Sequence, residues 1–484
     1  MKIRLADPRV WLIAALVITG ALAAARFDQS LWSDEATSVW LARQPIDQLL
    51  QTLCDPHPVG YYLLLKAWLT GGDGEAWLRL SSLLAALAGV IITYRLDVMW
   101  AGPRLAGLAA LLLALQPAYA WYASEVRMYA LVTTLGVAAA WLGERALQRP
   151  SAIRLGAYVA AAGAASWIDY SAVLPLALLQ LIWLARGAPQ ARRWLAAQLA
   201  VAALSLPAIT PAQQAALSNN IYPIFAAIQG ARLGVTLTPE AAATLIQAAT
   251  LIAGALALIV AGIWRRQQLA ARPATRWIIA ALWVIGLIVA ALPQAFTVKR
   301  RILLLLPLLA IPTAQALAAR PRTVLIGLSA AAAGVSLLSL QREPWRDVIA
   351  AAAAGQPPVI WVDEMAVPAF DYYWRRATPP TSTTSRWAQL NGRDLPTTPD
   401  LQPPVDRDLW LIVTESAYRN LIAFLPIDFL RNYELIGERH ERGIGVYVYR
   451  RRPFPDLTVP PPPPPASADE WGLRLLSPLD HCAP

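Results

Sequence analysis

The sequence has little charge, few histidines and two cysteines, and each shortage excludes a class of protein. Charged residues make up 15% of the 484 residues, against about 25% in soluble proteins. Hydrophobic residues make up 57%, and the mean hydropathy is +0.44, which is too apolar for a chain dissolved in water. Cys54 and Cys482 are too few for a disulfide framework. The lipid bilayer is the solvent that remains.

Motifs of metal, nucleotide and nucleic-acid chemistry are also missing. The three histidines are scattered and no His-Glu-x-x-His helix occurs, so no metal site is predicted. There is no Walker A loop, no Gly-x-Gly-x-x-Gly turn between a strand and a helix, and no Gly-x-Ser-x-Gly elbow. We expect no cofactor; a divalent cation stays open, although no ligand cluster supports one. The net charge of +10 forms no basic stripe with interleaved aromatics, so we expect no nucleic acid partner.

Apolar segments of helix length recur through residues 1–340, each near the roughly 20 residues that cross a bilayer. The first segment has a basic end and could be a signal peptide. We prefer an uncleaved helix, because "AAARFDQSLW" offers a weak cleavage site. We expect about eleven transmembrane helices, at 9–25, 77–97, 104–120, 125–147, 151–167, 170–186, 194–209, 241–264, 276–293, 300–318 and 323–340.

The charges at the ends of these segments predict the orientation. With the N-terminus in the cytoplasm, 17 of the 26 basic residues in 1–340 lie on the inner side, as in other multi-pass membrane proteins. Ten of the 13 acidic residues lie on the outer side, which insertion does not explain because acids contribute little to topology. Lysine accounts for three of the 41 basic residues, which suggests a GC-rich bacterial genome. We therefore expect a bacterial plasma membrane.

Two outer regions are expected to fold outside the bilayer. The loop 26–76 contains the short amphipathic pieces "DEATSVWLARQ", "IDQLLQTL" and "VGYYLLLKAWL", which suit the membrane interface. Residues 341–458 predict a small extracytoplasmic α/β domain, with strands at "PPVIWVD", "DLWLIVT" and "GIGVYVYR" and helices at "VPAFDYYWRR" and "SAYRNLIAFL". Residues 459–484 are a proline-rich spacer and tail.

The adjacent acids Asp34 and Glu35 are the strongest local signal for chemistry. Neighbouring residues of a helix point about 100° apart, so one carboxylate could take a proton while the other holds a hydroxyl. The alternative is a helix N-cap at Ser33 or Asp34. A second signal is Asp55-Pro56-His57-Pro58, where the two prolines fix the backbone around a titratable pair. The same residues also suit a plain helix entry.

Two further segments carry charge at the outer ends of spans. In "WYASEVRMYAL", Glu125 and Tyr129 are one helical turn apart and share a face, while Arg127 points elsewhere. An interfacial aromatic belt is the alternative. In "VKRRILLLLP", three consecutive cations lie against the positive-inside bias and can hold a phosphate, or pair with outer acids. These cations are Lys299, Arg300 and Arg301; Asp169 with Tyr170 and the segment "PWRDV" complete the candidates.

Five short motifs together resemble the GT-C membrane glycosyltransferases, in particular glycosyltransferase family 39, the branch with protein O-mannosyltransferases and the lipid A aminoarabinose transferase. Each motif is weak alone, but the five follow one another in the family's order over about residues 30–350. The chain departs from the pattern at Val59 and Gly60, at Arg301 with Ile302, and at Asp169 with Tyr170. The motifs are "SDEA", "HPVGYYLLLK", "EVRMYAL", "RRILLLLP" and "EPWRDVIAAA".

The resemblance implies a polyprenyl-phosphate sugar donor and an inverting transfer to a hydroxyl of a lipid, glycan or protein on the outer face. It implies that Asp34 is the general base and that Glu35 assists acceptor binding. The lipid-linked phosphate would be bound by Arg127 and Arg300, with Lys299. We also expect a set of further residues to bind substrate, namely Asp55, His57, Tyr61, Glu125, Tyr129, Asp169 and Arg301.

Two other classes compete with this interpretation. A polytopic transporter or lipid flippase predicts charges near span centres and an inverted repeat, and the sequence shows neither. A structural membrane protein with a partner-binding outer domain does not need the seven acids of loop 26–76. We therefore predict a polytopic α-helical, GT-C-like enzyme comprising residues 1–340, followed by the C-terminal α/β domain.

Overall fold

The computed structural model of the chain divides into two compact units. The first unit comprises Met1–Asp28 and Asp55–Leu340, and the second comprises Gln29–Cys54 and Gln341–Pro484. Each unit is described by itself. The structure describes residues 7–51, 57–185, 187–208, 296–317, 329–330, 332, 342–355, 359–363, 366–377, 386–390, 408–414, 429, 432–441 and 444–452.

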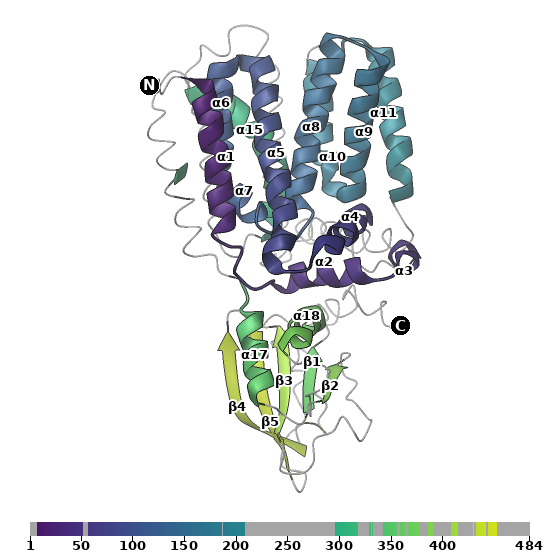
Figure 1. The fold of residues 1–484 in the computed structure, drawn as a ribbon. Helices are drawn as coiled ribbons and strands as arrows, with labels where there is room; N and C mark the ends of the chain where they lie inside the picture. Colours follow the sequence, from purple (N-terminus) through teal and green to yellow (C-terminus); the bar gives the residue numbers. More distant parts are fainter. Residues whose placement is uncertain are drawn as a thin grey trace, which may run out of the picture. The chain divides into compact units, whose positions relative to one another are not determined.

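The first unit is a bundle of helices packed side by side (Figure 1). Shorter elements join them at one end: helices α4 (Gly60–Trp68) and α7 (Pro117–Tyr122), and the 3₁₀ turns η1 (Leu69–Gly71), η2 (Tyr170–Ala172) and η3 (Leu206–Ala208). The long helices are α1 (Pro8–Ala24), α5 (Glu75–Ala101), α6 (Pro103–Ala114), α8 (Tyr129–Gln148), α9 (Ala152–Ile168), α10 (Val173–Ala185), α11 (Ala191–Ser205) and α15 (Phe296–Leu317).

The outer surface of this bundle is apolar. Ile13 of α1 is 60% exposed, Leu84 of α5 is 50% exposed and Leu199 of α11 is 72% exposed. Large apolar side chains exposed on several helices of one bundle suit contact with lipid or with another protein. Among the described residues, α5 is the helix that is long and apolar enough to cross a membrane, with a length of about 40 Å at 1.5 Å per residue.

The expected spans 9–25, 77–97, 151–167, 170–186, 194–209 and 300–318 are confirmed as helical regions. The expected continuous helix 104–120 is wrong, because the chain breaks between α6 and α7. Pro117 starts α7 and cannot donate a backbone hydrogen bond to continue α6. The spans 241–264 and 276–293 lie outside the described residues, as does 323–340 apart from Ser329, Ala330 and Ala332. The count of eleven spans stays a prediction.

The expected helix 125–147 also begins later than predicted, at Tyr129. The carbonyl of Trp121 accepts from the backbone N–H and the hydroxyl of Ser124. The carbonyl of Glu125 accepts from the Ser82 hydroxyl and from the Arg127 N–H. These local partners take the carbonyls that a continuous helix would use. Glu125 therefore lies in the connection before α8, and its predicted shared helix face with Tyr129 is wrong.

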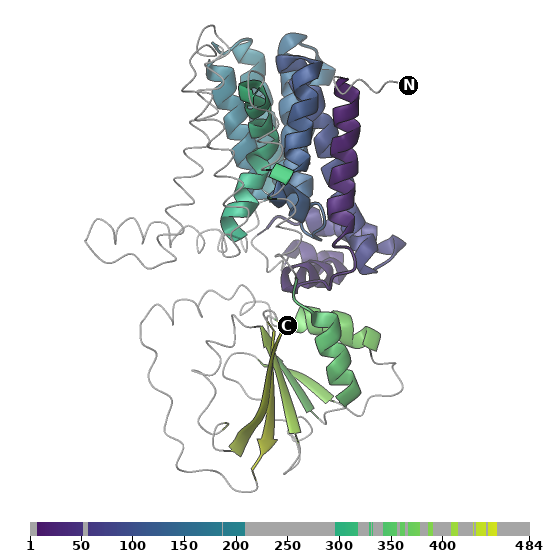
Figure 2. The same cartoon turned by 90° about the vertical axis from the view of Figure 1, so that its left-hand side faces the viewer.

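The second unit contains a five-stranded mixed sheet of order β2-β1-β3-β5-β4. Strand β1 is parallel to β2 and β3, and β5 is antiparallel to β3 and β4. Helices α17 (Trp345–Gly355) and α18 (Val367–Ala377) lie on one side of this sheet (Figure 2). The strands are β1 (Val359–Asp363), β2 (Arg386–Leu390), β3 (Asp408–Thr414), β4 (Tyr433–Glu441) and β5 (Ile444–Arg451).

The three predicted strands are confirmed as β1, β3 and β5, and "VPAFDYYWRR" is confirmed as α18. The two edge strands and α17 were not predicted. Strand β4, "YELIGERHE", has four charged side chains, a histidine and a glycine, a composition typical of an exposed edge rather than of a buried strand. The predicted helix "SAYRNLIAFL" lies outside the described residues.

The first part of the outer loop belongs to this second unit. Its predicted helical pieces are confirmed as α2 (Ser33–Arg43) and α3 (Ile46–Gln51). Helix α2 packs on α18. The backbone N–H of Leu31 donates to the Tyr373 hydroxyl at 2.6 Å, and the Arg43 guanidinium lies 5.7 Å from the centre of the Tyr372 ring. The segment that carries Asp34 and Glu35 thus folds on residues more than 300 positions later in the chain.

Candidate functional site

The predicted site residues fall into both units. Asp34 and Glu35 belong to the second unit. Asp55 lies outside the described residues, and the side chains of residues 299–301 in α15 lie outside the described part as well. The first unit contains the remaining predicted residues, His57, Tyr61, Glu125, Arg127, Tyr129 and Asp169.

Asp34 stands at the start of α2. The N-cap residue is Trp32, so neither Ser33 nor Asp34 is the N-cap. The Glu35 carboxylate accepts from the Trp32 N–H at 3.2 Å and so caps the helix from its third position. Asp34 is half-buried at the second helical position, where the helix N-terminus favours a negative charge.

Glu35 is fully buried and pairs with Arg342. Its Oε2 lies 3.4 Å from Nε of Arg342, and the two side chains are 0% and 1% exposed. An ion pair this deep is expensive to break, because the partner that remains is a buried charge. The described contacts of the carboxylate are structural, and its role in acceptor binding stays a prediction.

Glu343 binds Ser33, the residue directly before Asp34. Its Oε2 accepts from the Ser33 N–H at 3.0 Å, the Ser33 hydroxyl at 2.6 Å and the Trp345 indole N–H at 2.6 Å. Burial raises the pKa of Glu343 above its ordinary value, the negative charge of Asp34 raises it further, and the hydrogen bonds from Ser33 and Trp345 oppose the rise. The motifs "SDEA" and "EPWRDVIAAA" are therefore in direct contact.

Glu343 lies in the motif "EPWRDVIAAA" without a predicted role, and Arg342 is not among the predicted site residues. One signal was available, since the two charges directly precede "PWRDV" at the outer end of the last expected span. Which earlier residues they contact depends on long-range packing, and a single sequence carries no record of it.

A second cluster forms in the first unit around Tyr129. His57 Nε2 lies 3.7 Å from Oδ2 of Asp169, and the His57 and Tyr129 rings meet edge-on at 6.3 Å. The Arg127 guanidinium lies 5.8 Å from the centre of the Tyr129 ring. Asp169 also accepts hydrogen bonds from the N–H and the hydroxyl of Ser171. Four of the predicted residues are thus brought together from three parts of the chain.

The surroundings of this cluster are aromatic. Tyr122 meets Tyr129 at 5.1 Å, and the buried Tyr61 packs against Tyr62 on α4 at 5.7 Å. Glu125 is fully buried in the turn before α8. Arg127 and Tyr129 carry N–H and O–H groups that could donate to an oxyanion such as a phosphate, while Asp169 pairs with His57 and Glu125 adds a second carboxylate.

Two arginines of the first unit that the sequence analysis did not single out are also buried. Nη1 of Arg79 donates to the carbonyl oxygens of Arg26 at 3.2 Å and Phe27 at 3.0 Å. The Arg26 guanidinium lies 5.4 Å from the centre of the Trp121 ring. Because the last carbonyls after a helix need donors, Arg79 fixes the chain where it leaves α1, and we give it a structural role.

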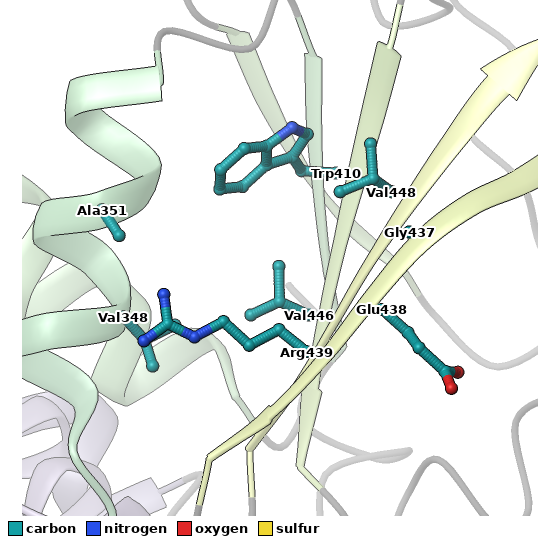
Figure 3. Close-up of a pocket in the computed structure, with 8 residues that line it drawn as sticks. All are labelled: Val348, Ala351, Trp410, Gly437, Glu438, Arg439, Val446 and Val448. Atoms are coloured by element: carbon teal, nitrogen blue, oxygen red, sulfur yellow. The ribbon is translucent and has the colours of Figure 1, made fainter.

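A cavity of about 230 Å³ lies between α17 and the sheet of the second unit (Figure 3). The Trp410 indole faces this cavity, the Arg439 guanidinium extends toward α17, and the Glu438 carboxylate points away. The other lining residues are Val348, Ala351, Gly437, Val446 and Val448. None of the predicted site residues lines it, so we give it no part in the proposed function.

No protein-family model matches the chain, and no curated protein matches it. The chain is similar to the crystal structure of ArnT from Cupriavidus metallidurans, with 15% identity over 91% of this chain and 97% of that one and a TM-score of 0.48. A second ArnT structure, bound to undecaprenyl phosphate, gives 13% identity over the same shares of the two chains and a TM-score of 0.44.

Two further solved structures are similar over smaller shares of their own chains. The oligosaccharyltransferase AglB from Archaeoglobus fulgidus, with an inhibitory peptide and a dolichol-phosphate, gives 11% identity over 76% of this chain and 63% of that one, with a TM-score of 0.46. The arabinosyltransferase EmbB from Mycobacterium smegmatis gives 18% identity over 70% and 32%, with a TM-score of 0.38. All three are GT-C glycosyltransferases, the class that the sequence motifs resemble. Identities of 11–18% and TM-scores of 0.38–0.48 indicate a similar fold and do not transfer a function to this chain.

Proposed function

We propose that the protein is a membrane glycosyltransferase that moves a sugar from a polyprenyl phosphate to an acceptor hydroxyl on the extracytoplasmic face, with inversion. The observation that carries the proposal is the pairing of the motifs. "SDEA" contacts "EPWRDVIAAA" in the second unit, and "HPVGYYLLLK" contacts "EVRMYAL" in the first. Motifs that matched a family by chance would have no reason to meet in pairs in the fold.

The chemistry assigns one task to each cluster. The Asp34 carboxylate takes the proton from the acceptor hydroxyl as its oxygen bonds to the anomeric carbon. The bond from that carbon to the phosphate oxygen breaks with the electron pair on the phosphate, which leaves as an anion. Arg127 is buried beside Tyr129 and stabilises the departing charge, since preorganised cations act most strongly where water is excluded. Arg300 is assigned the same task, with Lys299 beside it.

The apolar side chains exposed on the surface of the bundle agree with a donor that is a lipid. A lipid-linked phosphate places its own leaving group at the membrane surface, so no nucleotide-binding fold is needed. Undecaprenyl phosphate and dolichol phosphate, which are present in the ArnT and AglB structures, belong to the class of lipid that we propose for this chain. The acceptor class stays open among lipid, glycan and protein.

The transporter alternative is less well supported by the described helices. It requires buried charges near span centres. The buried Arg79 and Asp97 of α5, and Glu144 of α8, each lie about one turn from an end of the helix. Such positions suit a structural or interfacial role better than a pathway through the bilayer.

The test supplies purified protein in lipid with labelled polyprenyl-phosphate sugars and follows transfer to lipid, glycan and protein acceptors. D34N is expected to abolish transfer and to keep donor binding, because the amide cannot take the proton. D47N, which changes an exposed acid on α3 in the same loop, is the matched control and should keep activity. Full activity of D34N would show that the base is another residue, and lipid movement without sugar transfer would favour the transporter.

A further inference from the structure

The residues directly before and after Asp34 are anchored by two consecutive residues from the other end of the chain. Ser33 donates its N–H and its hydroxyl to Glu343. Glu35 pairs with Arg342 and caps the helix at Trp32. Asp34, between these two anchors, is half-buried. The anchoring residues thus restrict where this carboxylate lies and which way the first turn of α2 faces.

The anchoring is stronger than ordinary helix capping would require. One carboxyl oxygen of Glu343 accepts from three donors, two of them on Ser33. The backbone N–H of Arg346 also donates to the Ser30 hydroxyl at 3.2 Å. The chain at the start of α2 is therefore held to the segment 342–346 at three residues, Ser30, Ser33 and Glu35.

We propose that Arg342 and Glu343 are positioning residues that hold the Asp34 carboxylate where it can react, an inference that rests on the proposed function. Through these two residues the C-terminal domain is coupled to catalysis. They do not touch the substrate themselves. A residue that merely stabilises the fold would lower the amount of folded enzyme. A positioning residue lowers kcat of the folded enzyme, because a displacement of about 1 Å costs about 100-fold in rate.

The first experiment separates kcat from KM in the full-length protein in lipid, with polyprenyl-phosphate sugar as the probe. E343A is expected to lower kcat about 100-fold and to leave KM for the donor unchanged. E343Q should recover to within about tenfold of the wild type, because its amide oxygen still accepts from Ser33 but without the charge. E434A removes an exposed carboxylate of β4 in the same unit and should behave as the wild type.

The second experiment tests the contact without using activity. Ser33→Cys and Glu343→Cys are combined in a background in which Cys54 and Cys482 are replaced by Ala, and a short bifunctional thiol reagent is added. Cross-linking in the double variant and in neither single variant supports the contact. Absence of the cross-link in folded protein would overturn the proposal.

The outcomes distinguish this proposal from the proposed function. If the wild type transfers no sugar while the cross-link forms, the proposed function fails, and the positioning role fails with it although the contact is real. If the wild type transfers sugar and E343A is as active as E434A, the proposed function stands and the positioning role is overturned. A fall in kcat at unchanged donor KM, with recovery in E343Q, supports both.

Discussion

Gly60 allows α4 to approach α9 closely, and adding one methyl group there tests the geometry of the first-unit cluster. A Cβ at residue 60 would overlap the carbonyl oxygen of Trp167 and lie 3.0 Å from its carbonyl carbon. Because the obstacle is backbone, no side chain can rotate away. Restoring an ordinary contact requires α4 to move from α9 by about 1 Å.

The magnitude follows from two opposing effects. Overpacking of a tight contact costs about 1–3 kcal/mol, while alanine gains at most about 1 kcal/mol over glycine in a helix. We therefore expect G60A to destabilise the protein by about 1–2 kcal/mol. His57 precedes α4 and pairs with Asp169 just after α9, so the same movement separates that pair. A displacement of this size should lower kcat/KM about 100-fold.

Gly156 provides the control, since it lies on the same helix α9 and its added Cβ would meet nothing within 4 Å. G156A should keep activity and gain up to about 1 kcal/mol, because glycine is a poor helix former. Thermal denaturation in detergent and a donor titration of both variants measure the difference. If G60A is as stable and as active as G156A, the close approach of α4 and α9 does not hold the cluster together.

Three further predictions concern pairs of residues in one unit or the other. R342M removes the cation that pairs with the buried Glu35 carboxylate and should cost about 3–5 kcal/mol in thermal denaturation, and E35Q combined with R342M should recover most of it. Because the folded-state pKa of Glu343 is raised, its stabilising contribution is present below the ordinary value of 4.5 and is lost as the pH rises through the raised pKa. The melting temperature of the wild type relative to E343Q should therefore rise on acidification, and a constant difference would contradict the assignment. W77A removes the stacking on Trp68, whose ring centre is 4.7 Å away, and the hydrogen bond from the Trp77 indole N–H to the Trp68 carbonyl; faster proteolysis between α4 and α5 is expected, with W77F intermediate.

Helix positions in the bundle were largely predictable, because a run of apolar residues long enough for a bilayer has few other uses. The errors at 104–120 and 125–147 have local causes. Pro117 interrupts the helix expected at 104–120. The hydroxyl groups of Ser82 and Ser124 donate to backbone carbonyls that a continuous helix 125–147 would use for its own hydrogen bonds. Hydropathy averages over such single residues, so it locates a helix better than its ends.

The candidate site was predictable as a set of residue types and not as an arrangement. Asp34, His57 and Arg127 stand out because charge is scarce in an apolar chain, whereas Arg342 does not stand out in a polar segment. The departures from the family pattern at Gly60 and Asp169 looked unrelated in the sequence. In the fold they both act at the carboxyl end of α9, where Trp167 meets Gly60 and Asp169 meets His57.

Helix α2 gives a physical reason for a polar domain in an enzyme with the lipid donor that we propose. A helix of 11 residues is marginal by itself in water, and α2 buries Glu35 and Ser38 as well as apolar residues on its inner face. Lipid would not accept that face, because a buried charge needs a partner; the Ser38 hydroxyl already donates to the Asp34 carbonyl within the helix. Helix α18 and the Arg342–Glu343 pair provide the packing and the partners. The general base that we propose therefore depends for its position on residues of the C-terminal domain, whatever else that domain binds.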